Sequence, residues 1–433
     1  MSNPTATPPP ILVLFPNEWD KIEFAAPAMR ARYTVHYEGF DLFKFPENAQ
    51  LMWFNCERFI QKTLKKYRNK GLIAIISTDE QYGAMIAAVV AQALGLPTTS
   101  PESILRAQHK FYARERMREI APEATPPYSV FPYTETDASR YGMGFPMFVK
   151  PVKATYSILS RRCDDYGALR KHLGFRVLEK RILEKLVQPC DDLSRRYIKG
   201  YSVDAQHIIA EPVMQGHQVT VEGYAFEDKI HMIGVVDSFM YPDTMAFERF
   251  EYPSRLPQAV QERMLSLVEK VVRGFDFSLG LFNCELFYMP EKPVGEDLKL
   301  IEINPRLAYQ FSDLYQKVDG FSTYEALINL ALGKAPVIRH RAGRYANAAS
   351  FVLRAFEKTR IKSAPTEAQV RELEAKYADA RFLIYIKTGA SLERELKWLG
   401  SYRYAVLNLG GADLGELFDR YHAVKSELKF SFV

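Results

Sequence analysis

Residues 281–306 constrain the fold most strongly, because they predict two apolar strands that each carry an isolated carboxylate. Glu285 lies in the first run, LFNCELFY, and Glu302 and Asn304 lie in the second, LKLIEINPR. The turn-rich insert between them predicts a β-hairpin. Side chains alternate between the faces of a strand, so Glu302 and Asn304 share one face. A carboxylate among strand hydrophobics is costly unless it is paired or coordinated.

Oxygen ligands of this kind suit Mg²⁺, with phosphate oxygens and water completing the coordination shell. Taken singly, each glutamate is better explained as a solvent-facing acid on an edge hairpin. The joint pattern of Glu285 followed by Glu-x-Asn-Pro-Arg on the next apolar strand favours metal binding instead. The sequence therefore predicts a site for Mg²⁺ or Mn²⁺ at Glu285, Glu302 and Asn304, of the kind used in ATP chemistry.

At these residues the chain resembles the ATP-grasp superfamily. In that family an acid on one strand, and Glu and Asn on the next, bind the magnesium of Mg-ATP, and the arginine after Asn-Pro faces phosphate or a substrate carboxylate. The resemblance assigns the metal to Glu285, Glu302 and Asn304 and gives Arg306 a catalytic role. It implies a mixed α/β fold: an N-terminal parallel α/β (pre-ATP-grasp) domain, a two-lobed ATP-grasp domain and a small C-terminal α/β lobe.

Composition excludes several classes of protein. The chain has 433 residues, which is too long for one ordinary core, and its 47% hydrophobic and 25% charged residues are globular values. The net charge of +5 is mild, and no long Lys/Arg run predicts a nucleic-acid surface. The four cysteines form no Cys-x-x-Cys pair, so no disulfide framework is expected. With no signal-peptide pattern and no apolar run long enough for a membrane helix, we expect a cytoplasmic protein without a membrane partner.

Residue patterns predict four segments along the chain. Residues 1–10 are rich in Pro, Thr and Ser and are expected to form a disordered tail. In residues 11–100 short apolar strands alternate with an Ala-rich helix, which predicts a small parallel α/β domain; no Gly-x-Gly-x-x-Gly turn follows its first strand. The resemblance places the ATP-grasp domain at 101–335, with a hinge near 211–218, and a C-terminal lobe at 345–433.

Two lysines occupy the phosphate-binding positions of the resemblance. Ser100 and Pro101 predict a helix start, and we expect that helix to carry Lys110. A later apolar strand ends in Lys150, which can aim its ammonium at phosphate. Alone, Lys110 is better explained as a solvated helix lysine, and Lys150 can snorkel from a strand end. The resemblance assigns Lys110 to ATP phosphate, and Lys150 to the α- and β-phosphates and to catalysis.

The loop after Lys150 lacks the glycines whose amides wrap phosphate in many relatives. Small residues such as Ser157 remain available to bond phosphate. Further along, two predicted strands flank a bend that resembles the ATP-grasp hinge. The acid that commonly binds ribose is replaced there by an amide, which bonds a hydroxyl without charge assistance. The resemblance assigns four hinge residues to ATP: Glu211, Val213, Met214 and Gln218.

Three other positions stay open. Glu222 lies in the strand that leaves the hinge and is either an outward-facing strand residue or part of the site. Arg249 and Arg255 lie in a long aromatic and charged segment that is expected to be a loop, and loops of this kind often form substrate mouths. Either arginine could bind a carboxylate.

The resemblance implies an ADP-forming carboxylate–amine ligase, closest to dipeptide or L-amino-acid ligases. ATP would phosphorylate a small carboxylate, and an amine would attack the acyl phosphate; a homodimer is also expected. Two alternatives stay open. A biotin-carboxylase-like enzyme would use bicarbonate, although the glycine-rich lid and a Glu-His pair after Arg306 are missing. A nucleotide-binding protein without catalysis would explain the altered lid and Gln218. No P-loop or hydrolase motif is present.

Overall fold

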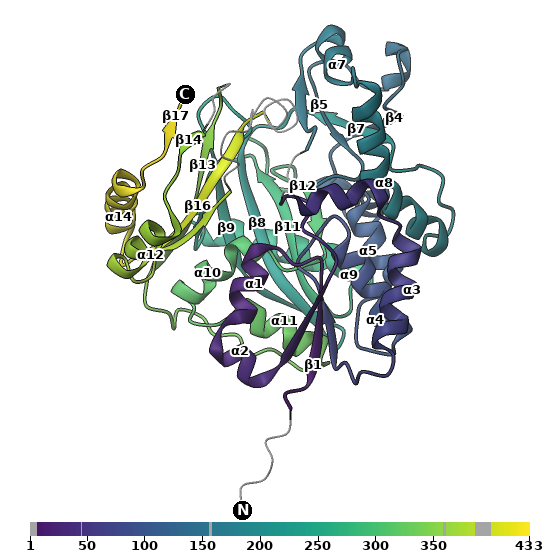
Figure 1. The fold of residues 1–433 in the computed structure, drawn as a ribbon. Helices are drawn as coiled ribbons and strands as arrows, with labels where there is room; N and C mark the ends of the chain where they lie inside the picture. Colours follow the sequence, from purple (N-terminus) through teal and green to yellow (C-terminus); the bar gives the residue numbers. More distant parts are fainter. Residues whose placement is uncertain (1–6, 45, 156–157, 358–360, 386–399) are drawn as a thin grey trace, which may run out of the picture.

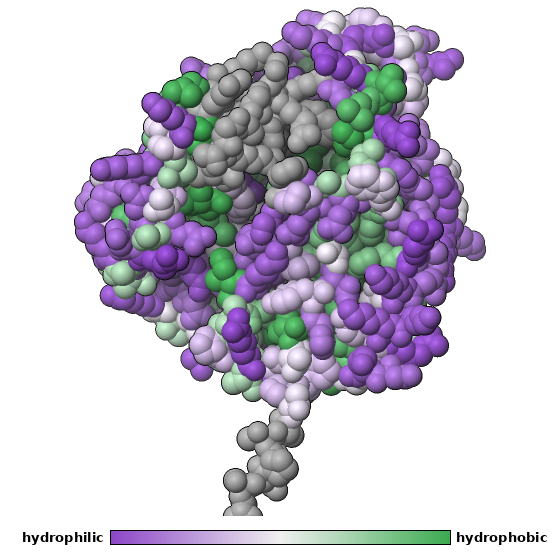
Figure 2. Space-filling model, in the orientation of Figure 1, coloured by the Kyte–Doolittle hydropathy of each residue, from purple (hydrophilic) through white to green (hydrophobic). Residues whose placement is uncertain are grey.

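The computed structural model describes residues 7–44, 46–155, 158–357, 361–385 and 400–433. Two large antiparallel sheets and one small parallel sheet form the body, and helices cover them (Figure 1). On the face shown in Figure 2, the described residues are mostly hydrophilic, with hydrophobic residues in small separate patches. Every helix within the described ranges is too short or too polar to cross a membrane.

The N-terminal sheet is parallel, as the sequence predicts, with strand order β2-β1-β3. Its central strand is buried along its length, which explains the continuous apolar run Ile-Leu-Val-Leu. The strands are β1 (Pro10–Leu14), β2 (Thr34–Glu38) and β3 (Ala74–Ile76). The helices around them are α1 (Glu18–Ala25), α2 (Pro27–Arg32), η1 (Glu47–Trp53), α3 (Cys56–Tyr67) and α4 (Gly83–Ala93).

The helix expected to carry Lys110 is in fact two helices. Ser100 caps α5 (Pro101–Gln108) as predicted, but His109 has an extended backbone and interrupts the helix. Lys110 is therefore the first residue of α6 (Lys110–Ile120). The break has a physical reason: the Lys110 amide donates to the Val152 carbonyl over 2.8 Å, a bond that an uninterrupted helix would not allow.

A four-stranded antiparallel sheet follows, with order β4-β7-β5-β6. Its strands are β4 (Ser129–Pro132), β5 (Met147–Pro151), β6 (Arg161–Cys163) and β7 (His207–Pro212). The helical segments of this region are η2 (Pro122–Ala124), η3 (Ala138–Tyr141), α7 (Tyr166–His172) and α8 (Val177–Tyr197).

The largest sheet is antiparallel, with order β12-β11-β8-β9-β10-β13-β16-β15. Its strands are β8 (His217–Phe226), β9 (Lys229–Met240), β10 (Phe247–Tyr252), β11 (Gly280–Tyr288), β12 (Leu298–Asn304), β13 (Asn347–Ala355), β15 (Arg381–Ile384) and β16 (Tyr402–Gly411). Beside it lie α9 (Gln258–Gly274), α10 (Tyr309–Val318), α11 (Thr323–Ala331), α12 (Glu367–Lys376) and α14 (Leu414–Glu427). A small separate pair joins β14 (Ile361–Ser363) to β17 (Ser431–Phe432).

One expectation changes here. The segment around Arg249 is not a loop: β10 pairs with β9 and with β13. Through β13, the C-terminal strands β13, β16 and β15 continue the sheet that carries the β11–β12 hairpin. All four cysteines are buried thiols without disulfides, as expected.

Candidate active site

The β11–β12 hairpin brings the three predicted metal residues together. Glu285 lies opposite Glu302, and Asn283 lies opposite Asn304. The Asn304 amide nitrogen donates to Oδ1 of Asn283 over 3.0 Å and to Oε1 of Glu302 over 3.4 Å. From the neighbouring strand β8, Gln218 donates to Oε2 of Glu285 over 2.9 Å. Gln218 therefore contacts the carboxylate pair, although it was expected to bind ribose.

Two facing carboxylates give this hairpin an excess of negative charge. Burial, together with the charges of Glu302 and Glu80, raises the pKa of Glu285 to about 8. Burial alone would also raise the pKa of Glu302, but the ammonium groups of Lys110 and Lys150 outweigh it and lower that pKa to about 2. The pair thus titrates unequally because only one member has a cation in contact.

The donor set fits a hard divalent cation. Asn304 uses its amide nitrogen in both hydrogen bonds, so its oxygen is the atom that can face a metal. No group of three or more His, Cys, Asp or Glu side chains in the described part of the chain has metal-binding geometry. A cation here would therefore take Glu285, Glu302 and Asn304 and draw its remaining ligands from outside the protein, as Mg²⁺ does when it is bound with phosphate.

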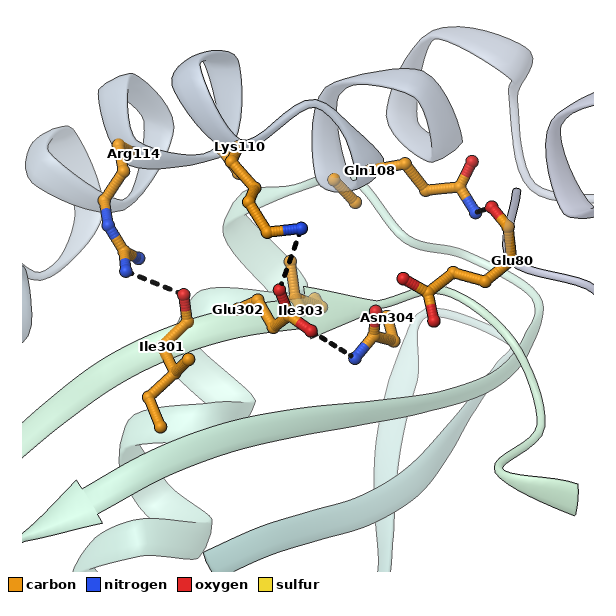
Figure 3. Close-up of a pocket in the computed structure, with 10 residues that line it drawn as sticks. Glu80, Gln108, Lys110, Arg114, Ile301, Glu302, Ile303 and Asn304 are labelled. Atoms are coloured by element: carbon orange, nitrogen blue, oxygen red, sulfur yellow. Dashed lines mark hydrogen bonds and ion pairs between the residues drawn. The ribbon is translucent and has the colours of Figure 1, made fainter. Parts of the chain in front are cut away.

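Lys110 fastens helix α6 to this hairpin. Its ammonium lies 3.1 Å from Oε2 of Glu302 (Figure 3). It also donates to the Ala154 carbonyl over 3.0 Å. Burial would lower the pKa of Lys110, but Glu302 and then Glu80 outweigh it and raise the pKa. The lysine consequently stays charged between the hairpin and the loop that follows β5.

The other predicted lysine belongs to a buried ion-pair network. The ammonium of Lys150 lies 2.9 Å from Oε2 of Glu211, and Nε of Arg114 lies 2.5 Å from Oε1 of the same residue. Arg114 also donates to the Ile301 carbonyl over 2.7 Å (Figure 3). Burial would raise the pKa of Glu211, but the two cations lower it. The network thus connects β5 and β7 of one sheet to β12 of the other through α6.

Sequence reasoning missed Arg114. Its signal was present but weak, because Arg114 lies four residues after Lys110 and residues four apart share a helix face. Val213 and Met214 lie partly buried in the linker between β7 and β8, where the adenine linker was expected. Gly216 in this linker has φ +151°, and a Cβ there would come within 2.4 Å of the Tyr288 carbonyl.

The loop after β5 is only partly described. Ser157, which was expected to contact phosphate, lies outside the described residues. Thr155 is buried, and its hydroxyl has no hydrogen-bond partner. Lys153 is buried as well, and its ammonium donates to the Glu80 carbonyl over 2.9 Å and to Oε1 of Gln108 over 3.3 Å. Those contacts hold the loop against the N-terminal domain.

Glu80 joins the site from the N-terminal domain, and sequence reasoning did not identify it. It lies in the loop after β3, and its carboxylate forms an ion pair with Arg306. Glu80 lines the same cavity as Gln108, Lys110 and Asn304 (Figure 3). The general rule that sites form beyond the carboxyl ends of parallel strands was its only sequence signal.

The three open positions have clear outcomes. Glu222 is not an outward-facing residue: it is buried, and burial raises its pKa to about 8. Arg249 pairs with Glu248 and Glu251, and Arg255 pairs with Glu251. The two arginines therefore already have carboxylate partners within the protein.

Comparison with known proteins places the fold. No protein-family model matches the sequence. An uncharacterised protein, y4rH of Sinorhizobium fredii, is 24% identical over 311 residues, which cover 71% of this chain and 58% of that protein. The chain thus matches less than two thirds of the length of this curated relative.

Several solved structures are similar over almost the whole chain. An L-amino acid ligase from Bacillus licheniformis has a TM-score of 0.66 at 16% identity, and the match covers 99% of both chains. A carboxyaminoimidazole ribonucleotide synthase from Aspergillus clavatus, complexed with ATP, has a TM-score of 0.67 at 15% identity, covering 97% of this chain and 98% of the other. A biotin carboxylase from Campylobacter jejuni has a TM-score of 0.62 at 13% identity, covering 98% and 92%. These proteins share one architecture, and the chain has their ATP-grasp fold, as residues 281–306 predict.

Proposed function

We propose that the protein is an ATP-dependent carboxylate–amine ligase that forms an amide bond and releases ADP and phosphate. The supporting observation is the convergence of five charged or amide side chains between the two antiparallel sheets. They are Lys110, Lys150, Glu285, Glu302 and Asn304. Lysines facing a pair of carboxylates suit a substrate that carries both phosphate and a divalent cation.

In this proposal bound Mg²⁺ neutralises phosphate charge and orients the phosphates for transfer. Glu285, Glu302 and Asn304 hold it. Lys110 and Lys150 bind phosphate oxygens, and Glu211 and Arg114 keep Lys150 in place. Phosphoryl transfer needs positioning and charge neutralisation more than it needs a protein nucleophile, so a site made of cations and carboxylates is sufficient.

The proposed reaction has two steps. In the first, the bond from the γ-phosphorus to the bridging oxygen of ADP breaks, and a bond to a carboxylate oxygen of the substrate forms. Arg306 stabilises the charge of the transferring group. In the second, an amine attacks the acyl carbon, phosphate leaves, and the nitrogen loses a proton. Amino acids are the proposed acid and amine, because an L-amino acid ligase is among the similar structures.

Phosphate release from Mg-ATP tests this proposal. The purified protein is assayed with pairs of amino acids and small carboxylates, and bicarbonate is included as an acid. We compare Glu302→Gln with Glu291→Gln, a control in the exposed turn of the same hairpin. We expect release that needs both an acid and an amine, a kcat at least about 100-fold lower in Glu302→Gln, and normal release in the control.

Other outcomes would reject parts of the proposal. Normal turnover by Glu302→Gln would reject the metal assignment. Release with bicarbonate alone would indicate a carboxylase. ATP binding by calorimetry without release in any pair would favour a nucleotide-binding protein that lacks catalysis.

A further inference from the structure

Gln218 contacts the candidate metal site, although it was expected to contact ribose. It is the second residue of β8, directly after the hinge linker. Its amide nitrogen donates to Oε2 of Glu285 over 2.9 Å. The strand register explains this contact: Glu285 lies opposite Thr220, and Gln218 lies two residues before Thr220 on the same face of β8. A long side chain can reach such a diagonal neighbour on the next strand.

Glu302 and Glu285 are held very differently. The Glu302 carboxylate has a partner at each oxygen, with Lys110 at Oε2 and Asn304 at Oε1. Among the residues that the structure describes, the Glu285 carboxylate has one hydrogen bond, from Gln218, and no ion pair. Without Gln218 the Glu285 side chain would therefore lose the contact that fixes its rotation, whereas Glu302 would keep both of its partners.

We propose that Gln218 is a positioning residue of the metal site, which holds Oε2 of Glu285 and thereby leaves Oε1 for the divalent cation. The inference rests on the proposed function and refines its metal site. Hydrogen bonds to a metal ligand fix its orientation, and losing one typically weakens metal binding about 10- to 100-fold. Glu285 depends on this support more than Glu302 does, because it has a single partner.

The surrounding charges explain why an uncharged donor suits this position. The charged side chains that act on Glu285 are Glu302, Glu80, Arg306 and Lys110. Each of the two cations has its carboxylate contact elsewhere, Lys110 with Glu302 and Arg306 with Glu80. A further cation bonded to Glu285 would repel an incoming divalent metal, and an acid in place of Gln218 would add another negative charge. An amide holds the carboxylate without either effect.

The same bond has a consequence for nucleotide choice. Residues 212–221 contain no Asp or Glu. The preceding acid, Glu211, is 1% exposed and pairs with Lys150 and Arg114. The hinge and the first half of β8 therefore offer no free carboxylate to the ribose hydroxyls. Neutral hydrogen bonds are weaker than charge-assisted ones, so we expect ADP to bind less than about 10-fold more tightly than 2′-deoxy-ADP.

The test compares Gln218→Met with Gln258→Met. Methionine keeps the length of the side chain and removes the donor. Gln258 is the matched control, because its amide also donates to a glutamate, Oε1 of Glu262 over 3.2 Å, at an exposed site on α9. Binding of Mn²⁺ is measured by electron paramagnetic resonance with a non-hydrolysable ATP analogue present. We expect the affinity for Mn²⁺ to be at least about 10-fold lower in Gln218→Met and unchanged in the control.

Calorimetry with ADP and 2′-deoxy-ADP separates a metal role from a ribose role. The ratio of the two affinities, measured with Mn²⁺ at saturation, should be the same in the wild type and in Gln218→Met. Binding of ADP in EDTA reports on the nucleotide site without metal and should also be unchanged. This second measurement shows that the variant is folded around the nucleotide.

Three results would overturn the inference. The first is an unchanged affinity for Mn²⁺ in Gln218→Met. The second is a loss of the preference for ADP in that variant, which would indicate a ribose contact. The third is an equal loss of Mn²⁺ binding and of metal-free ADP binding, which would indicate a general structural role.

These measurements need no turnover, so they separate the inference from the ligase proposal. The expected loss of Mn²⁺ affinity, in a protein that releases no phosphate with any substrate pair, would support the inference and reject only the ligase reaction. Absence of Mn²⁺ binding in the wild type would reject the metal site and the inference with it.

Discussion

The Arg114→Met substitution tests the buried network that connects the two antiparallel sheets. Methionine keeps the apolar length of the side chain but removes the guanidinium. Glu211 would keep its ion pair with Lys150 but lose the shorter one with Arg114. The Ile301 carbonyl would lose the hydrogen bond that Arg114 donates to it. We expect a lower free energy of unfolding. We also expect weaker packing of α6, the helix that begins with Lys110, against the two sheets.

The magnitude follows from burial. Arg114 and Glu211 are 2% and 1% exposed, so solvent screens their interaction very little. Removing one partner of a buried ion pair costs about 3–5 kcal/mol, because the remaining charge is left uncompensated. Lys150 partly compensates Glu211, which places the expected loss near the lower end, about 3 kcal/mol. That loss reduces the ratio of folded to unfolded protein more than about 100-fold.

Urea unfolding, followed by circular dichroism and tryptophan fluorescence, measures this loss. Arg118→Met is the matched control, since Arg118 lies on the same helix, is 60% exposed and pairs with Glu115. The control should cost less than about 1 kcal/mol. If Arg114→Met were no more destabilising than Arg118→Met, the network would not stabilise the fold in the way argued from its burial.

Two further predictions concern stability. Burial raises the pKa of Asp20 to about 6, whereas the pKa of an Asp in the unfolded chain is about 3.9. Its stabilising contribution is therefore present below pH 4 and lost as the pH rises through 6. The free energy of unfolding of the wild type, relative to Asp20→Asn, should fall by up to about 3 kcal/mol between pH 4 and 7; a constant difference would contradict this. Gly216→Ala should lower the free energy of unfolding by about 1–3 kcal/mol. The control Gly295→Ala should lower it less, because Gly295 also has positive φ but no atom lies near the position of an added Cβ. Equal losses in the two variants would exclude the Tyr288 contact as the cause.

Local sequence was sufficient where a single segment determines its own structure. The alternation in residues 281–306 predicted the β11–β12 hairpin, in which the structure places Glu285 opposite Glu302. The cap at Ser100 and the apolar run of β1 were predicted for the same reason: capping and burial patterns act within a few residues. The order of these motifs along the chain also predicted the ATP-grasp fold.

Tertiary contacts decided what local patterns could not. The helix break at His109 depends on the Val152 carbonyl, in the loop that follows β5, and β10 is held as a strand by its pairing with β9 and β13. Glu80 is 226 residues from Arg306, so no spacing could place them together. The sequence by itself determined which residues carry charge. The partner of each charge was decided by the packing of the sheets, because ion pairs depend on distance in space and not along the chain.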